Sequence, residues 1–365
     1  MSQDLRVRVP PRPPYKNRKI LYENMKTKII KISSRNPNKK IIKEASIIIK
    51  NGGLVAFPTE TVYGLGANAL DEKAVRKIFT AKGRPSDNPL IIHIADYKDL
   101  NKLAHALPSY AKKLISKFWP GPLTLIVRKK SIVPDIVTAK SSTVAIRMPN
   151  HKVTLALIKE AGVPIAAPSA NKAGRPSGTS AEDVLDDFKN KIELILDAGQ
   201  THFGLESTVL DVSRSTPVIL RPGAISKEAL ERFLKISLGN ESNSKGKARS
   251  PGMKYRHYAP KAKVILIPKD KTVNIWQEED RLIQDFHDKG KTVGILATLR
   301  QNIKRPKADE ICFAGSTLNR VGKNLFHCLR QLDKKKVDII IAESVPEHDM
   351  GLAVMNRLRK ACAKN

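Results

Sequence analysis

A short apolar run that ends in a polar, glycine-rich segment constrains the fold of this chain more than any other feature. The run Leu54–Phe57 has the pattern of a buried strand. It is followed directly by Pro58-Thr59-Glu60-Thr61-Val62-Tyr63-Gly64-Leu65-Gly66. Hydroxyls, a carboxylate and glycines at the end of a strand are typical of the edge at which open α/β sheets bind ligands. The pattern therefore predicts an α/β fold with a ligand site at this edge.

Three further polar motifs occur at the edges of predicted strands or helices. In chain order they are Lys82-Gly83-Arg84-Pro85, Pro168-Ser169-Ala170-Asn171 and Glu206-Ser207-Thr208-Val209. One such fragment would carry little information. Four of them in one chain, each at the end of a predicted element, indicate a single site assembled from distant segments.

Residues two apart in an extended segment point the same way, which predicts the side chains that share this site. Glu60 would face away from its neighbours, and Pro85 biases Arg84 out of the helical region, toward the cleft. Two cations opposite hydroxyl and amide donors suit a polyphosphate and a carboxylate. The pairs predicted to face the cleft are Thr59 and Thr61, Lys82 and Arg84, and Ser169 and Asn171.

Arg147 ends the apolar run Val144-Ala145-Ile146. An unpaired arginine in such surroundings is costly, so its side chain should meet a carboxylate.

Each candidate residue also has a purely structural interpretation. Lys82 and Arg84 could be a solvated pair that stabilises the end of a helix, and Thr61 could be a turn hydroxyl bonded to its own backbone. His93, in Leu90–Ile94, could be a satisfied strand histidine, and Ser207 could simply start a strand.

Length and periodicity predict two domains, since 365 residues exceed one ordinary core. Apolar periodicity is lost over 239–252 and restarts beyond Pro260. We predict a disordered basic extension at 1–27, an α/β domain at 28–238, a linker at 239–261 and a Rossmann-like βαβ domain at 262–365. Within the linker, residues 250–260 combine tyrosines with basic side chains, which predicts a lid over the first domain's cleft.

Strands are expected at 54–57, 90–94, 123–127, 143–148, 164–167, 194–196, 207–212, 216–220, 263–267, 292–297, 310–314 and 337–342.

The charge of the chain leaves two interpretations open. Lys and Arg number 66 against 35 Asp and Glu, a net charge of +31. Such charge could attract RNA, or it could be a solvated lysine-rich surface. Aromatic residues make up only 5% and no RNA-binding signature accompanies the lysines.

Several classes of protein are disfavoured by what the sequence lacks. No apolar run of 18 residues occurs, so we predict that the chain does not span a membrane. Cys312, Cys328 and Cys362 lack metal-site spacing and are predicted to be ordinary thiols of a reducing compartment. Gly64-x-Gly66-x-x-Ala69 is a weak match to the dinucleotide fingerprint, which would suit an oxidoreductase but leaves the later motifs without a role. There is no Walker motif, so a nucleotide would be bound without a P-loop.

Many long motifs of this chain resemble the threonylcarbamoyl-AMP synthases of the Sua5/YrdC/YciO family, in the two-domain Sua5 form. The resemblance covers residues 28–365. The motifs that carry it are PTETVYGLG, KGRPSDNPLIIHI, WPGPLTLI, TVAIRMPNH, APSANKAGRPS, GLESTVLD, ILRPGAI, SPGMKYRHYAP and GLAVMNRLRKA.

The resemblance implies a function that composition and spacing do not reach. It implies an open twisted YrdC-like sheet with a ligand cleft and a small Rossmann-like second domain. Enzymes of this family are nucleotidyltransferases that join L-threonine, bicarbonate or CO2, and ATP into threonylcarbamoyl-AMP and pyrophosphate, for the t6A37 modification of tRNA. Mg2+ would accompany the ATP, a threonylcarbamoyl transferase would consume the adenylate, and the enzyme would be cytoplasmic, with a weak tRNA contact. The alternative is an RNA-binding or ribosome-maturation module with a basic cleft.

The resemblance also implies roles for individual residues. Lys82 and Arg84 would be catalytic, and Arg147 would pair with the carboxylate of threonine. The threonine set is implied to be Thr61, His93, Arg147 and Ser207. The ATP set is implied to be Arg84, Asn88, Thr143, Ala167, Ser169, Asn171, Ser177, Arg221 and Tyr258.

Overall fold

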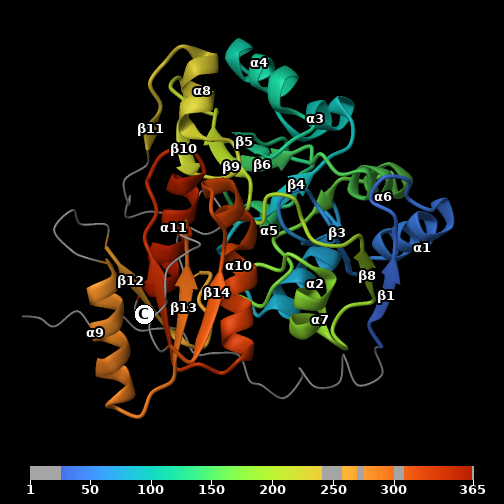
Figure 1. Ribbon diagram of the computed structural model, residues 1–365. Helices are drawn as coiled ribbons and strands as arrows, with labels where there is room; N and C mark the ends of the chain where they lie inside the picture. The colour runs from blue at the N-terminus through green and yellow to red at the C-terminus, as the bar shows by residue number, and fades with distance from the viewer. Residues whose placement is uncertain (1–25, 241–256, 269–274, 300–307, 364–365) are drawn as a thin grey trace, which may run out of the picture.

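Two β-sheets, each covered by helices, form the frame of the molecule (Figure 1). The computed structural model describes residues 26–240, 257–268, 275–299 and 308–363. The predicted basic extension before residue 26 and most of the predicted linker lie outside these residues. Among the described residues, no helix is long and apolar enough to cross a membrane.

The first sheet has 11 strands in the order β1-β8-β2-β3-β7-β4-β6-β5-β9-β10-β11. The strands are β1 (Lys28–Lys31), β2 (Val55–Phe57), β3 (Gly64–Asn68), β4 (Ile91–His93), β5 (Leu123–Arg128), β6 (Thr143–Arg147), β7 (Ile165–Ala166), β8 (Leu194–Asp197), β9 (Thr208–Asp211), β10 (Val218–Arg221) and β11 (Gly239–Asn240). The helices are α1 (Lys39–Lys50), α2 (Glu72–Lys82), α3 (Tyr97–Leu103), α4 (Ser109–Phe118), α5 (Asp135–Thr138), α6 (Lys152–Ala161), α7 (Ala181–Phe188) and α8 (Lys227–Leu234). The eight strands predicted for this part are present, while β1, β3 and β11 were not predicted.

The segment that contains Gly64 and Gly66 forms a strand rather than a phosphate-binding loop. It is β3, which pairs antiparallel with β2 so that Val55 lies opposite Gly66. A Cβ on Gly66 would lie 2.4 Å from the ring of Phe57, so the glycine makes room for that ring. No helix opens directly after these glycines, because α2 begins only at Glu72. Their spacing therefore serves the packing of the sheet and not a dinucleotide.

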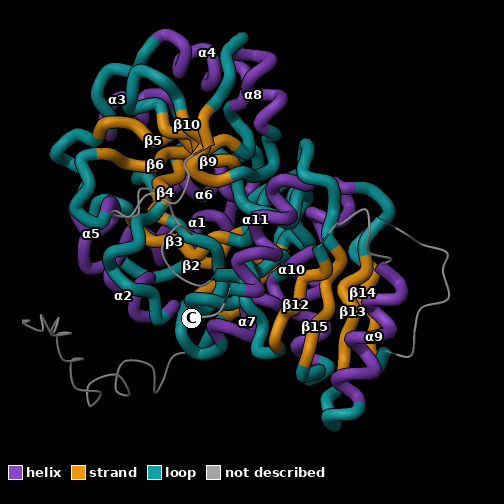
Figure 2. The backbone as a smooth tube through the Cα atoms, turned by 90° about the vertical axis from the view of Figure 1, so that its left-hand side faces the viewer, coloured by secondary structure: helices purple, strands orange, loops and turns teal. Residues whose placement is uncertain are grey.

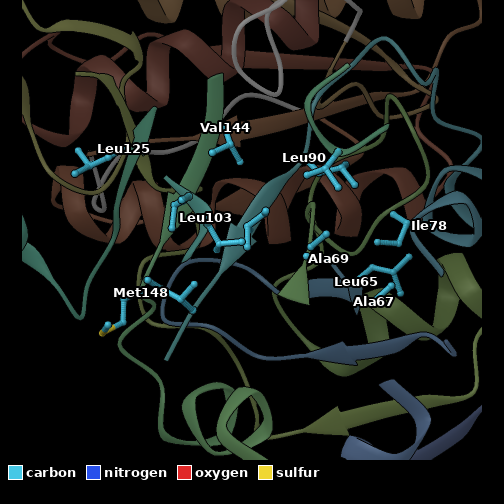
Figure 3. Close-up of a cluster of buried hydrophobic side chains, with 14 of the residues drawn as sticks. Leu65, Ala67, Ala69, Ile78, Leu90, Leu103, Leu125, Val144 and Met148 are labelled. Atoms are coloured by element: carbon cyan, nitrogen blue, oxygen red, sulfur yellow. The ribbon is translucent and has the colours of Figure 1, made fainter. Parts of the chain in front are cut away.

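The central strands place two of the candidate residues side by side. β4 runs parallel to β6, and His93 lies opposite Arg147 in the register of the pair. Their apolar neighbours belong to a large core of fully buried residues, part of which Figure 3 shows around Leu65, Ile78, Leu90 and Val144. The two polar residues therefore stand at the end of strands that the core holds firmly.

The second sheet is parallel throughout, with its 4 strands in the order β12-β15-β13-β14. Its strands are β12 (Lys263–Ile267), β13 (Val293–Ala297), β14 (Glu310–Phe313) and β15 (Ile339–Glu343), and its helices are α9 (Ile275–His287), α10 (Leu318–Lys334) and α11 (Met350–Cys362). Alternate side chains serve opposite faces: Val264 and Ile340 pack with α10 and α11, whereas Ile295 and Ile341 pack with α9. Figure 2 shows α10 and α11 on the side of this sheet that faces the first sheet, with α9 on the outer side.

One prediction about the cysteines is wrong. Cys312 on β14 and Cys328 on α10 are joined in a disulfide, of which Cys362 is not part. The two cysteines are 16 residues apart and meet only because α10 packs against β14. The sequence spacing carries no trace of this contact.

Candidate active site

The four polar motifs converge on one pocket, which also receives the described end of the predicted lid. The pocket is bordered by strand ends of the first sheet and by the segment that leads to the second. Its lining residues are Thr59, Thr61, Val62, Tyr63, Gly64, Lys82, Arg84, Ile91, His93, Arg147, Ala167, Pro168, Ser169, Asn171, Ala173, Gly174, Glu206, Ser207, Arg221, His257 and Tyr258.

Arg147 is the buried cation at one end of the pocket. Its Nη1 donates to the hydroxyl of Thr61 at 2.9 Å, its Nε donates to the carbonyl of Gly121, and its Nη2 lies 2.8 Å from Glu60 Oε1. The predicted carboxylate partner is therefore supplied by the protein itself. Since Arg147 and Glu60 are both buried, each offsets the cost of burying the other's charge.

Thr59 and Thr61 line the pocket and Glu60 does not, as the sequence predicts, although residues 58–63 do not run straight. Thr59 Oγ1 accepts from the backbone N–H of Thr61 and of Val62, which folds the segment into a turn. The hydroxyls of Thr59 and Thr61 still meet at 2.9 Å. Glu60 therefore contacts the same arginine as Thr61, but at the other terminal nitrogen of the guanidinium. Thr59, and not Thr61, is the hydroxyl that holds the turn.

His93 lies beside Arg147 and is neutral. Burial, followed by the positive charge of Arg147, lowers the pKa of His93 to about 3. Its ring meets that of Phe57 edge to face, with the centroids 6.3 Å apart. Within the described part of the chain, its buried Nδ1 has no hydrogen-bond partner.

Replacing His93 with glutamine is expected to make the fold less sensitive to acid. A histidine whose pKa falls from 6.5 to about 3 on folding binds its proton in the unfolded state first. Stability is therefore lost as the pH falls below 6.5, by about 2 kcal/mol between pH 7 and pH 5. Urea unfolding of the wild type and of His93→Gln at both pH values measures this. Equal pH dependence of the two proteins would contradict the neutral state of His93.

Lys82 is the buried cation at the other end of the pocket. It is the last residue of α2, where the left-handed Gly83 ends the helix. Its Nζ donates to the carbonyl oxygens of Ser169 and Asn171, and only 3% of the residue is exposed. Burial, followed by the neighbouring Arg84, lowers the pKa of Lys82 well below its ordinary value. The interpretation of Lys82 as a solvated surface cation is therefore wrong.

The loop opposite Lys82 is held by its own polar contacts. Ser169 Oγ donates to Asn171 Oδ1 at 2.6 Å, so the two side chains that were predicted to share a face do so. Arg84 donates to the carbonyl oxygens of Asn88 and Pro89. The cations, the hydroxyl and the amide thus border one space, an arrangement suited to a polyphosphate.

Ser207 forms another part of the pocket lining, together with side chains from neighbouring strands. Its hydroxyl is 2.7 Å from that of Thr124, and Arg221 donates to both the carbonyl and the hydroxyl of Ser207. Next to it, Glu206 accepts from Ser177 Oγ at 2.5 Å. Sequence reasoning did not select Glu206 as a site residue, although a carboxylate at the start of a buried strand is itself a signal that a cation is near.

The remaining predicted residues lie behind the lining or at its margin. Asn88 is buried and holds Arg84 through its carbonyl, and Ser177 reaches the pocket only through Glu206. Thr143 begins β6, whose last residue is Arg147, and its hydroxyl meets Ser141. Thr143 lies four positions before Arg147 on the same strand, about 13 Å along the backbone.

The described end of the predicted lid borders the pocket. Tyr258 is buried, stacks on Phe326 of α10 with ring centroids 5.1 Å apart, and is followed by Ala259, whose N–H donates to the carbonyl of Gly174. His257 lies next to it in the lining. Residues 250–256, the rest of the predicted lid, are outside the described residues.

Replacing Gly223 with alanine is expected to lower turnover ~100-fold, because small misplacements in a site have effects of that order. A Cβ at Gly223 would lie 2.3 Å from the backbone nitrogen of Thr208 and 2.5 Å from the carbonyl oxygen of Glu206. Backbone atoms cannot rotate away, so β9 and the segment with Ser207 that leads into it must shift. Gly239→Ala is the matched control, since its Cβ would meet only Val218 at 4.0 Å. Equal activity of both variants would contradict the tight placement of this strand.

Comparison with known proteins finds two family models that match consecutive parts of this chain. The family model for Sua5, YciO and YrdC proteins, described as "Telomere recombination", matches residues 47–223. The model described as "Threonylcarbamoyl-AMP synthase, C-terminal domain" matches residues 225–363.

Curated relatives and solved structures agree with these matches over most of the chain. The chain is 49% identical to threonylcarbamoyl-AMP synthase of Pyrococcus abyssi over 92% of its own length and 97% of the relative's. It is 46% identical to that of Bacillus subtilis, over 90% and 94% of the two chains. The crystal structure of P. abyssi Sua5 complexed with L-threonine superposes with a TM-score of 0.87 at 48% identity, covering 92% of this chain and 97% of that one.

Proposed function

The chain belongs to the Sua5/YrdC/YciO family in its two-domain form, and from this premise we propose that it is an L-threonylcarbamoyladenylate synthase. The observation that carries the proposal is a single pocket lined by two buried basic side chains, Arg147 and Lys82, and by the hydroxyls of Thr59, Thr61, Ser169 and Ser207. Threonine and ATP together present a carboxylate, a hydroxyl and a polyphosphate to the protein. The pocket offers a complement to each.

We propose that threonine binds at the Arg147 end. Its carboxylate would lie on the Thr61 side of the guanidinium, because Glu60 occupies the other side. Its hydroxyl would face the buried hydroxyls of Thr61 and Ser207. The unpartnered Nδ1 of His93 is available to one further polar group of the amino acid.

The reaction needs positioning more than it needs a protein nucleophile. The threonine amine takes up CO2 to form a carbamate, one carbamate oxygen then attacks the α-phosphorus of ATP, and the bond to pyrophosphate breaks. Lys82 and Arg84 would stabilise the negative charge that moves onto the leaving pyrophosphate. Tyr258 and the walls of the pocket would exclude water, which hydrolyses a mixed anhydride. No group of the enzyme forms a covalent bond with a substrate in these steps.

We propose that Mg2+ reaches the site on the triphosphate. The described residues contain no group of three His, Cys, Asp or Glu side chains placed to hold a metal ion. Mg2+ usually keeps several waters and binds substrate phosphates, so it does not need such a group of protein side chains. Lys82, Ser169 and Asn171 would then contact phosphate oxygens and not the metal.

The remaining parts of the proposal follow from the chemistry of the product. A carbamoyl adenylate is reactive, so a threonylcarbamoyl transferase that modifies tRNA to t6A must take it over soon after release. A weak direct contact with tRNA would be favoured by the net charge of +31, and a cytoplasmic location remains part of the proposal. The alternative of a pure RNA-binding module leaves the buried basic residues and the pocket that they line without a role.

Pyrophosphate release from ATP tests the function. The purified full chain is expected to release pyrophosphate only when threonine and bicarbonate are both present, and mass spectrometry should detect threonylcarbamoyl-AMP. Omitting either substrate is the control. Tight RNA binding that weakens steeply with salt, without any pyrophosphate release, would instead favour the RNA-binding alternative.

A further inference from the structure

A buried arginine of the second domain reaches into the wall of the first domain's pocket. Arg357 lies on α11 and is 0% exposed. Its Nε donates to Glu206 Oε2 at 3.1 Å, and Nη2 lies 3.1 Å from the same oxygen. Its Nη1 donates to the carbonyl of Pro222. The guanidinium is therefore held by groups of the first domain, although its own helix belongs to the second.

The contact of Arg357 with Glu206 bears directly on the pocket. Glu206 lines the pocket, and its second oxygen accepts from Ser177. Arg357 also lies over the ring of Tyr258, 5.7 Å from its centroid, and Tyr258 is another lining residue. One side chain of the second domain thus fixes two parts of the lining that come from different segments.

The electrostatics of this cluster depend on the arginine. Burial raises the pKa of Glu206, but the cations Arg357 and Arg221, together with the Ser177 hydroxyl, outweigh it and leave that pKa lowered. Other ionisable groups face Glu206 from several segments. They are Lys360 on α11, Lys82 on α2, and His257 and Tyr258 in the connecting segment.

Loss of Arg357 would leave the buried Glu206 carboxylate without the cation that contacts it directly. The carboxyl group would then take up a proton, which changes its contact with the Ser177 hydroxyl. This changes a wall at which the proposed substrates bind.

We propose that Arg357 is a positioning residue through which the second domain completes the active site of the first. It holds Glu206 ionised and in place, so that Ser177 keeps its orientation, and it supports Tyr258 over the pocket. The catalytic assay of this inference rests on the proposed function. The inference explains why the second domain carries an arginine that is fully buried against a pocket wall of the first.

Methionine at position 357 removes the charge while keeping the apolar bulk, and Arg359→Met is the matched control. Arg359 lies on the same helix but is exposed and pairs with Glu347. Arg357→Met is expected to lower kcat/KM for ATP on the order of 100-fold, because breaking a buried pair strands the remaining charge. Arg357→Lys should recover part of this loss, and Arg359→Met should match the wild type. Circular dichroism and thermal unfolding confirm that each variant is folded.

The pH profile distinguishes positioning from a merely structural role. Without Arg357 the pKa of Glu206 must rise, so the activity of Arg357→Met relative to wild type should increase with pH as Glu206 ionises. Adding Glu206→Gln should abolish this pH dependence and should cost little further activity, since both changes act on one contact. These results would support the inference.

Three results would overturn it: wild-type kcat/KM in Arg357→Met, a loss that is the same at every pH, or losses of the two substitutions that simply add. A wild-type chain that releases no pyrophosphate would refute the proposed function instead. The two failures are therefore separable.

Discussion

Exchanging L-threonine for L-2-aminobutyrate, which lacks only the side-chain hydroxyl, is expected to lower kcat/KM ~10⁴-fold. The reason is the set of buried hydroxyls at the Arg147 end. Thr61 bonds both Thr59 and Arg147, and Ser207 bonds Thr124. A substrate hydroxyl can join this network, whereas 2-aminobutyrate has only hydrogen at that place and forms none of these bonds.

L-serine is the informative comparison, because it keeps the hydroxyl and lacks the methyl group. One methyl group in a pocket discriminates only ~10–200-fold, so serine should be a poor substrate and 2-aminobutyrate a poorer one. The measurement is initial pyrophosphate release at subsaturating amino acid, with each compound in turn. Comparable turnover of threonine and 2-aminobutyrate would refute the placement of the substrate hydroxyl against Thr61 and Ser207.

The convergence of the polar motifs was predictable because strand ends meet at the edge of a sheet. The segments around Thr61, Lys82, Ser169 and Ser207 are distant in the chain, yet each follows or precedes an apolar element, and all line one pocket. The requirement that a buried arginine meet a carboxylate also held, with Glu60 as the partner. Burial and charge are visible in a sequence, and both enforce pairing.

The identity of partners was less predictable than the need for them. Nothing in the apolar period of α11 shows that Arg357 crosses to Glu206, because periodicity reports which face is buried and not what covers it. The same holds for Arg330 on α10, which donates hydrogen bonds to the carbonyl of Pro176 and the carboxylate of Asp187 in the first domain. The resemblance of the Gly66 segment to a dinucleotide fingerprint has a related explanation. The missing side chain of Gly66 makes room for Phe57 and not for a phosphate.

Replacing Lys82 with methionine is expected to lower kcat on the order of 1,000-fold at saturating threonine and ATP, the effect of removing one preorganised donor from a charged transition state. Lys82 Nζ already sits between the carbonyl oxygens of Ser169 and Asn171, so its position is fixed before substrate arrives. Lys73→Met, at an exposed position on the same helix, is the control. A Lys82→Met variant with a kcat near that of the wild type would remove this lysine from the catalytic set.

The same lysine should make nucleotide binding take up a proton. Its pKa is lowered in the free protein, first by burial and then by Arg84, whereas an adjacent triphosphate favours the charged ammonium and raises it again. At a pH between these two values the free lysine is partly neutral and the bound one is charged, so binding consumes protons. Calorimetry of ATP binding without threonine, in buffers with different ionisation enthalpies, measures the uptake. The uptake should disappear in Lys82→Met and persist in Lys73→Met. An uptake that survives the loss of Lys82 would place the polyphosphate against a different cation.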